Sequence, residues 1–121
     1  MILWIGLGGA VGSVLRYLLG GVVQRASGMP FPLGTLAINV TGCFIIGALS
    51  QHYVGVQTHP QMRTALMTGF CGGFTTFSAF SLETAGLIRG GEYQKAGAYI
   101  LLSVVVSIVA TFAGMAAMKA A

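Results

Sequence analysis

Four long hydrophobic runs follow one another along the chain, separated by short stretches that contain polar residues, proline or glycine. The runs cover residues 2–23, 33–53, 62–88 and 93–118. A helix needs about 20 mostly apolar residues to cross the hydrocarbon core of a bilayer, and each run reaches that length. The pattern therefore predicts an all-α membrane protein with four transmembrane helices. The connecting stretches leave no room for a soluble domain, so residues 1–121 form a single transmembrane domain.

The scarcity of charge supports the same interpretation. Of the 121 residues, 55% are hydrophobic and only 7% are Asp, Glu, Lys or Arg, whereas a soluble domain carries about 25% charged residues. A water-facing surface cannot be built from so few charges, so the lipid bilayer is the expected solvent for most of the surface. The basic residues are scattered singly. They favour a role in membrane orientation and no nucleic-acid partner.

The positive charges are divided evenly between the two sides of the predicted bundle. Arg25, Arg89 and Lys95 fall on one side, and Arg63, Lys119 and the N-terminal amine fall on the other. Membrane orientation follows the Lys and Arg bias between short loops, and that bias nearly vanishes here. Either the protein inserts in both orientations, or a weak residual bias fixes one. Four helices enclose little interior, so we also expect oligomerisation.

The third run contains a stretch that makes a poor helix, in which Gly72-Gly73 is followed by Thr75-Thr76. Glycine costs about 1 kcal/mol relative to alanine within a helix, and threonine is β-branched. The stretch predicts a break, so that protein, ion or water must satisfy the freed backbone groups. Carbonyls freed in this way bind cations in transporters with discontinuous helices. The alternative is close helix packing through small residues.

Polar side chains at mid-membrane depth mark the second and fourth runs. The Asn39 amide must face protein or water, either as a donor to a ligand or as a bond between helices. In the fourth run, hydroxyl residues recur every four positions and therefore share one helical face. They could donate to an anion without carrying charge, or bond back to their own helix. These residues are Tyr99, Ser103, Ser107 and Thr111.

Phe77 and Phe80 share a face if the helix resumes after the break, and Ser81 and Thr84 continue that side. The edge of an aromatic ring is positive, so two ring edges could solvate a small anion. Packing against lipid or protein is the alternative.

Two ionisable residues, Arg16 and Glu83, also lie within the runs. Such residues suggest function, but each is near enough to a helix end for a structural role to come first. The cysteines, Cys43 and Cys71, are not a paired motif, and we expect reduced packing residues. No nucleophile–base pair or Cys/His cluster indicates an enzyme.

Taken together, these residues resemble the Fluc (CrcB) family of fluoride channels across all four runs. The motifs that carry the resemblance are Gly12-x-x-x-Arg16, Gly34-Thr35-x-x-x-Asn39-x-x-Gly42 and Gly72-Gly73-Phe74-Thr75-Thr76-Phe77-Ser78. The resemblance implies a dual-topology antiparallel homodimer in the cell (inner) membrane. Its two pores would export fluoride passively. Phe74 departs from the smaller aliphatic residue of the family pattern, which affects local packing only.

The resemblance also implies roles for individual residues. A structural sodium ion (Na⁺) at the dimer centre would be held by the backbone carbonyls of Gly72 and Thr75. Arg16 would lie near the pore entrance, with Glu83 close by. The fluoride pathway would comprise Asn39, Phe77, Phe80, Ser81, Thr84, Tyr99, Ser103, Ser107 and Arg16.

Two other functions compete with a fluoride channel. A small multidrug-type exporter has a similar length and topology, but it needs a carboxylate in its first span, where this chain has only Arg16 as a charged residue. A non-transporting membrane assembly subunit would explain the glycines, but not the combination of hydroxyls, amide and broken helix.

Overall fold

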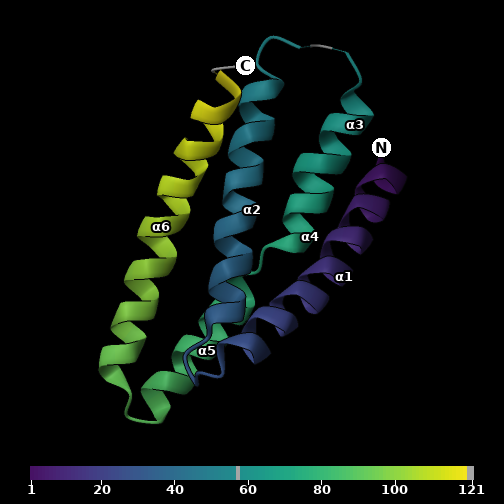
Figure 1. The fold of residues 1–121 in the computed structure, drawn as a ribbon. Helices are drawn as coiled ribbons and strands as arrows, with labels where there is room; N and C mark the ends of the chain where they lie inside the picture. Colours follow the sequence, from purple (N-terminus) through teal and green to yellow (C-terminus); the bar gives the residue numbers. More distant parts are fainter. Residues whose placement is uncertain (57, 120–121) are drawn as a thin grey trace.

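The chain crosses back and forth four times as long helices in the computed structural model, which describes residues 1–56 and 58–119 (Figure 1). No strand occurs among these residues. The four segments 2–27, 33–52, 60–89 and 93–119 are each long and apolar enough to span a membrane. The prediction of an all-α, four-span membrane protein is confirmed. The elements are α1 (Ile2–Ser27), α2 (Leu33–His52), α3 (Pro60–Thr64), η1 (Ala65–Cys71), α4 (Gly72–Phe74), α5 (Phe77–Arg89) and α6 (Tyr93–Lys119).

Helix α1 runs past the predicted boundary at residue 23 and ends at Ser27. Gly28 stops it by adopting a left-handed conformation, with φ of 61°. A glycine in this conformation is a common helix terminator because it has no Cβ to clash. The hydrophobic run ended earlier, so the helix end follows the backbone signal rather than the change in polarity.

The third span is broken where the sequence predicted it. The segment begins as α3, widens into the π-helix η1, and closes with the short α4. Thr75 and Thr76 are then extended, with ψ of 156° and 109°. The Thr76 hydroxyl accepts from the Ala79 N–H at 3.1 Å, which caps the start of α5. The chain leaves the line of α3 and α4 at this point (Figure 1).

Small residues let the helices approach closely on both sides of the bundle. A Cβ at Gly12 of α1 would collide with the Phe70 carbonyl, and one at Gly114 of α6 would collide with the Phe44 carbonyl of α2. A Cβ at Gly73 would collide with Gly9 in the same way, whereas a Cβ at Gly72 would meet no atom of another segment within 4 Å. Close packing therefore accounts for Gly73 but not for Gly72, and both the break and the packing are present.

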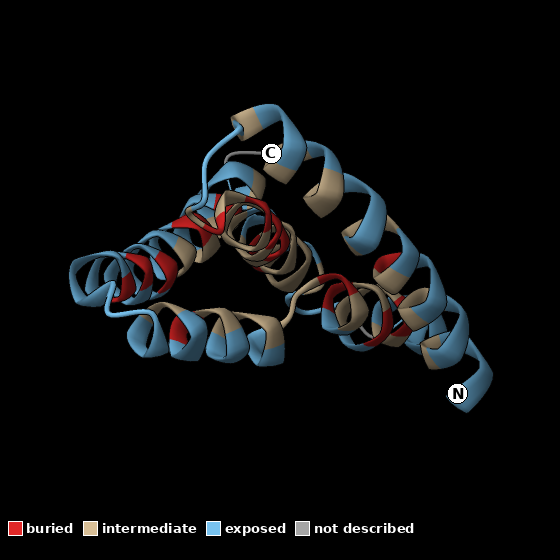
Figure 2. Ribbon diagram, turned by 90° about the horizontal axis from the view of Figure 1, so that it is seen from below, coloured by how far each residue is buried: buried red, intermediate tan, exposed pale blue. Residues whose placement is uncertain are grey.

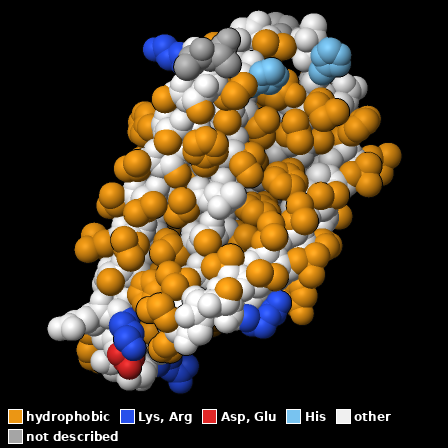
Figure 3. Space-filling view, in the orientation of Figure 1, with side chains coloured by type: hydrophobic (Ala, Val, Ile, Leu, Met, Phe, Trp, Pro, Cys, Tyr) orange, Lys and Arg blue, Asp and Glu red, His pale blue; other side chains and the backbone are white. Residues whose placement is uncertain are grey.

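The exposed surface is mostly hydrophobic. Buried residues lie on the sides of the helices that face one another, and the outer sides are exposed (Figure 2). Apolar side chains cover the middle of the face drawn in Figure 3, with Lys and Arg in its upper and lower parts. This distribution, with most of the Lys and Arg toward the two ends, is that of a multi-pass membrane protein.

Candidate functional site

A cavity of about 700 Å³ lies beside the break, between α2, α6 and the third span. We call it the central groove. It brings together most of the residues that the sequence singled out for function. These are Asn39, Gly72, Thr75, Phe77, Phe80, Ser103 and Ser107.

The Asn39 side chain from α2 holds the break open. Its amide nitrogen donates to the Thr76 carbonyl at 3.1 Å, and its amide oxygen accepts from the Thr76 N–H at 2.8 Å. These bonds replace the helical hydrogen bonds that Thr76 lacks. An amide NH₂ carries two hydrogens, so one N–H remains for a ligand. The two interpretations of Asn39, as a bond between helices and as a donor, are therefore compatible.

Arg16 reaches the same break from α1. Its Nε donates to the Gly73 carbonyl at 3.0 Å, near the C-terminal end of α4, where carbonyls lack helical partners. Arg16 therefore has a structural role, as the sequence favoured, but it stabilises the break and does not lie at the membrane interface. Arg16 does not line the central groove.

The carbonyls of Gly72 and Thr75 are among those at the break that receive no hydrogen bond from a described residue. The Gly72 carbonyl would normally pair with the Thr76 N–H, which Asn39 has taken. The Thr75 carbonyl likewise lacks its helical hydrogen bond, because the Ala79 N–H donates to the Thr76 hydroxyl instead. The Cys71 carbonyl, by contrast, accepts from both the N–H and the hydroxyl of Thr75. Gly72 and Thr75 are the residues whose carbonyls the family resemblance assigns to sodium, and that assignment stays a prediction.

Aromatic rings lead from the exposed side of the groove into the protein. Phe77 is 80% exposed, and its ring centroid lies 5.4 Å from that of Phe80. Phe80 lies 5.2 Å from Tyr99, which is fully buried. Phe31 then meets Tyr99 edge to face at 5.6 Å. The sequence reasoning missed Phe31, whose signal is an aromatic residue between two prolines.

The predicted hydroxyl stripe of α6 divides into free and bonded members. The Tyr99 and Ser103 hydroxyl oxygens are buried, with no hydrogen-bond partner among the described residues. Leaving a buried polar group unpaired costs about 1–3 kcal/mol, so the Ser103 hydroxyl, which lines the central groove, is a candidate for a ligand. Tyr99 lines none of the three cavities, and its hydroxyl lies next to Thr35 and Glu83. Thr111, in contrast, donates to the Ser107 carbonyl at 3.1 Å and is bonded to its own helix.

Ser81 and Thr84 do not join the central groove. Ser81 is exposed, and the buried Thr84 hydroxyl donates to the Phe80 carbonyl at 2.7 Å. Thr84 therefore supports the backbone that carries Phe80.

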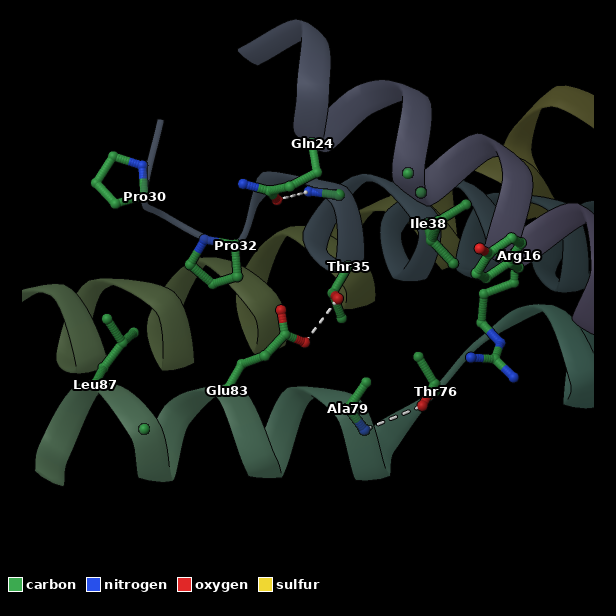
Figure 4. Close-up of a pocket in the computed structure, with 15 residues that line it drawn as sticks. Arg16, Gln24, Pro30, Pro32, Thr35, Ile38, Thr76, Ala79, Glu83 and Leu87 are labelled. Atoms are coloured by element: carbon green, nitrogen blue, oxygen red, sulfur yellow. Dashed lines mark hydrogen bonds between the residues drawn. The ribbon is translucent and has the colours of Figure 1, made fainter. Parts of the chain in front are cut away.

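A second cavity, of about 440 Å³, lies on the other side of the break between α1, α2 and α5 (Figure 4). Arg16, Thr35 and Glu83 line it. The Thr35 hydroxyl donates to the Glu83 carboxylate at 2.7 Å, and no salt bridge joins Arg16 to Glu83 among the described residues. The cavity places a cation and an anion near the break without neutralising either directly.

Gln24 holds the loop between α1 and α2 in place beside this second cavity, an arrangement we call the Gln24 clamp (Figure 4). Its amide nitrogen donates to the carbonyls of Met29 and Phe31 at 2.9 and 3.0 Å, and its oxygen accepts from the Gly34 N–H at 2.9 Å. The hydrophobic pattern placed Gln24 in a loop and gave no indication of this clamp.

Comparison with known proteins places this architecture in a family. A family model described as CrcB-like protein, Camphor Resistance (CrcB), matches residues 3–115. The chain belongs to the CrcB family. A protein of Rhizobium meliloti (strain 1021) named fluoride-specific ion channel FluC is 50% identical over 122 residues, which cover 98% of this chain and 96% of that protein. A protein of the same name from Geobacter sulfurreducens is 46% identical over 119 residues, which cover 98% of this chain and 96% of that protein. Another from Sulfurovum sp. is 44% identical over 119 residues, which cover 98% of this chain and 94% of that protein.

The CrcB match spans all four helical segments, so the resemblance carried by the three motifs is confirmed at the level of the family. The one departure, Phe74, is 2% exposed and stacks on Phe70 at 5.4 Å. Gly42 leaves room for this ring in the CrcB fold, because a Cβ there would press against the ring of Phe74 and the side chain of Thr75.

Proposed function

We propose that this protein is a fluoride-selective channel that lets fluoride leave the cell passively and so protects against fluoride toxicity. The observation that carries the proposal is the central groove, where uncharged donors line a path beside the broken third span. Asn39, Ser103 and Ser107 supply those donors, and Phe77 and Phe80 flank them. Family relatives at 44% to 50% identity are named fluoride-specific ion channels, which supports the same function.

The donor chemistry suits a small, strongly hydrated anion. Such an ion enters a narrow path only if protein groups replace the water that it loses. Conduction also requires sites weak enough to release the ion, preferably several in series. Neutral amide and hydroxyl donors meet both needs, because they stabilise the anion without a full opposite charge. The buried Ser103 hydroxyl has no described partner and is free to donate.

The two phenylalanines contribute through their ring edges. The rings of Phe77 and Phe80 are inclined at 55° to each other, so they are not stacked face to face. Ring hydrogens carry partial positive charge, and an anion is attracted to an edge rather than to a face. The pair therefore supplies a weak site with no competing carboxylate, hydroxyl or amide oxygen of its own.

A second copy of the chain, inserted in the opposite orientation, completes each pore. The support comes from the exposed backbone at the break. Unpaired carbonyls in hydrocarbon cost several kcal/mol each, and Gly72 is exposed beside Phe77. A partner would cover this surface. The even division of positive charge supports opposite insertion, since neither orientation is favoured.

Sodium fits the free carbonyls of Gly72 and Thr75. Both oxygens lack described donors, and backbone carbonyls at broken helices are suitable ligands for sodium. Contributed by two copies, they would hold the ion at the dimer centre. When bound, sodium supplies a positive potential near the anion path. The protein would reside in the cell (inner) membrane, where fluoride leaves the cytoplasm.

Fluoride efflux from proteoliposomes tests the function. Purified protein is reconstituted in vesicles loaded with potassium fluoride, and release is followed with a fluoride electrode after a potassium ionophore is added. We expect rapid fluoride release and no release of chloride under the same conditions. Release that requires an imposed proton gradient would identify a coupled carrier, and absence of release would refute fluoride transport.

A further inference from the structure

A third cavity continues the central groove toward one end of the molecule. It has a volume of about 300 Å³ and lies where the loop after α2 meets α3 and η1. Met67 and Thr68 line both this cavity and the central groove. The two spaces therefore adjoin along η1, and Arg63 and Thr64 line the outer one. We call the outer cavity the Arg63 mouth.

The Thr68 hydroxyl is available where the two spaces meet. Thr75, Thr84 and Thr111 each donate to the carbonyl four residues earlier, which is the usual behaviour of threonine in a helix. Thr68 is exposed and makes no such bond among the described residues. It lies within a π-helix, a conformation that is frequent at functional sites. Its hydroxyl can therefore donate to a ligand.

The charge at the Arg63 mouth is positive. Arg63 is exposed and forms no salt bridge with a described residue. The two acidic side chains of the chain, Glu83 and Glu92, lie beyond the break, on α5 and in the loop after it. No side-chain carboxylate in this half of the third span offsets the guanidinium. Positive charge at the opening of a cleft raises the local concentration of anions.

We infer that the Arg63 mouth is an outer binding site for small anions, in which Arg63 attracts the ion and the hydroxyls of Thr64 and Thr68 pass it to the central groove. The inference rests on the proposed function and extends it. Arg63 makes the site selective for anions over cations, while its exposure keeps binding weak. The neutral donors of the central groove, and not Arg63, select among anions of different size.

Fluoride flux at low and high fluoride concentration tests the site. Arg63→Gln is compared with Lys119→Gln, which removes the same charge at the same end but lines none of the three cavities. We expect Arg63→Gln to lower the flux at low fluoride by roughly fivefold, and to approach the unmodified protein at high fluoride, where local enrichment no longer limits the rate. Lys119→Gln changes the division of charge between the two ends by the same amount and is expected to lose less flux than Arg63→Gln, and Arg63→Lys retains most of the flux.

Thr68→Val tests the hydroxyl, with Thr41→Val as the matched control on the exposed side of α2. Only the first is expected to lower the flux at low fluoride. Equal losses in Arg63→Gln and Lys119→Gln would overturn the inference, because they would indicate a general charge effect. A loss in Arg63→Gln that persists at high fluoride would also overturn it, since it would indicate a structural role. If the unmodified protein conducts no fluoride, the proposed function itself fails.

Discussion

Asn39 and the aromatic pair connect single residues most directly to the proposed function. Asn39 makes two hydrogen bonds to Thr76, and it lines the central groove at the same time. Phe77 and Phe80 emerge from the first turn after the break. Three side chains at the break therefore both depend on its backbone geometry and line the proposed anion path.

Asn39→Asp separates the two tasks of this amide. The carboxylate still accepts from the Thr76 N–H, but it cannot donate to the Thr76 carbonyl, and it places a negative charge on the anion path. We expect fluoride flux in proteoliposomes to fall by at least about tenfold, because like charge repels the permeant ion. Size-exclusion chromatography checks that the protein remains assembled. Flux at the unmodified level would contradict a role for Asn39 in the path.

Phe77→Ile and Phe80→Ile remove the ring edges while keeping apolar side chains of intermediate size. Each substitution is expected to suppress fluoride efflux strongly and to leave the protein assembled. Phe112→Ile serves as the control, because Phe112 is 66% exposed on α6 and lines none of the three cavities. If both pathway variants release fluoride as fast as the control, the aromatic part of the path is wrong.

The sequence identified these residues by type and spacing, but it could not identify the residues that hold them in position. Phe31 and Gln24 act through contacts with a loop and with α6, and no periodic pattern encodes such contacts. The positions of Ser81 and Thr84 also depend on how α5 turns after the break. Spacing placed them beside the phenylalanines, whereas the fold leaves both outside the groove.

The break in the third span is the element that two of the three cavities share, because Thr76 lines both of them. Two glycines and two threonines predicted it, because both residue types weaken a helix. The π-helix before it was not predicted. No residue preference distinguishes a π-turn from an α-turn in a sequence, and η1 packs closely against α1, where Gly8 and Gly69 admit the backbone. Packing of that kind is a tertiary property.

The loop between α1 and α2 is the second element that contributes to the proposed path. Gln24 bonds to Phe31 and Gly34, Phe31 packs against Tyr99, and Tyr99 packs against Phe80. The clamp at one end of this series therefore fixes an aromatic ring that lines the groove at the other. Gln24 is thus a positioning residue for the Phe80 side of the path.

Gln24→Ala tests the clamp. It removes three hydrogen bonds and should lower the free energy of unfolding in detergent by about 1–3 kcal/mol, with a partial loss of fluoride flux. Gln61→Ala is the control, because Gln61 is exposed and makes no side-chain hydrogen bond to a described residue. Gln24→Glu keeps the acceptor for the Gly34 N–H and should restore part of the stability. Equal stability of the two alanine variants would exclude the clamp.

At the scale of the whole molecule, hydrophobic pattern and charge determine most of what the fold shows. The four runs predicted the four spans because the bilayer imposes a minimum length on each. Assembly is less accessible to a single sequence. A surface that binds a second copy and a surface that faces lipid are both apolar, so composition does not distinguish them. The distribution of positive charge is the part of the sequence that bears on how copies meet.

That distribution can be altered to test opposite insertion. In the unmodified protein, a tag at the C-terminus should be accessible from both sides of the membrane. Arg89→Gln combined with Lys95→Gln leaves Arg25, in the last turn of α1, as the remaining one of the three basic residues at its end, so we expect the other end, with the termini, to face the cytoplasm in nearly every copy. Fluoride flux should then collapse for lack of oppositely inserted partners.

Coexpression distinguishes lost pairing from simple damage. A second variant, Met29→Lys with Tyr93→Lys, adds positive charge at exposed positions of the first end and should insert the opposite way. If opposite copies must pair, each variant alone is nearly inactive, whereas the two together conduct fluoride. Flux that stays low in the mixture would mean that the substitutions impair the protein directly. A tag found on one side only in the unmodified protein would exclude dual insertion, because pairing between opposite orientations requires both to be present.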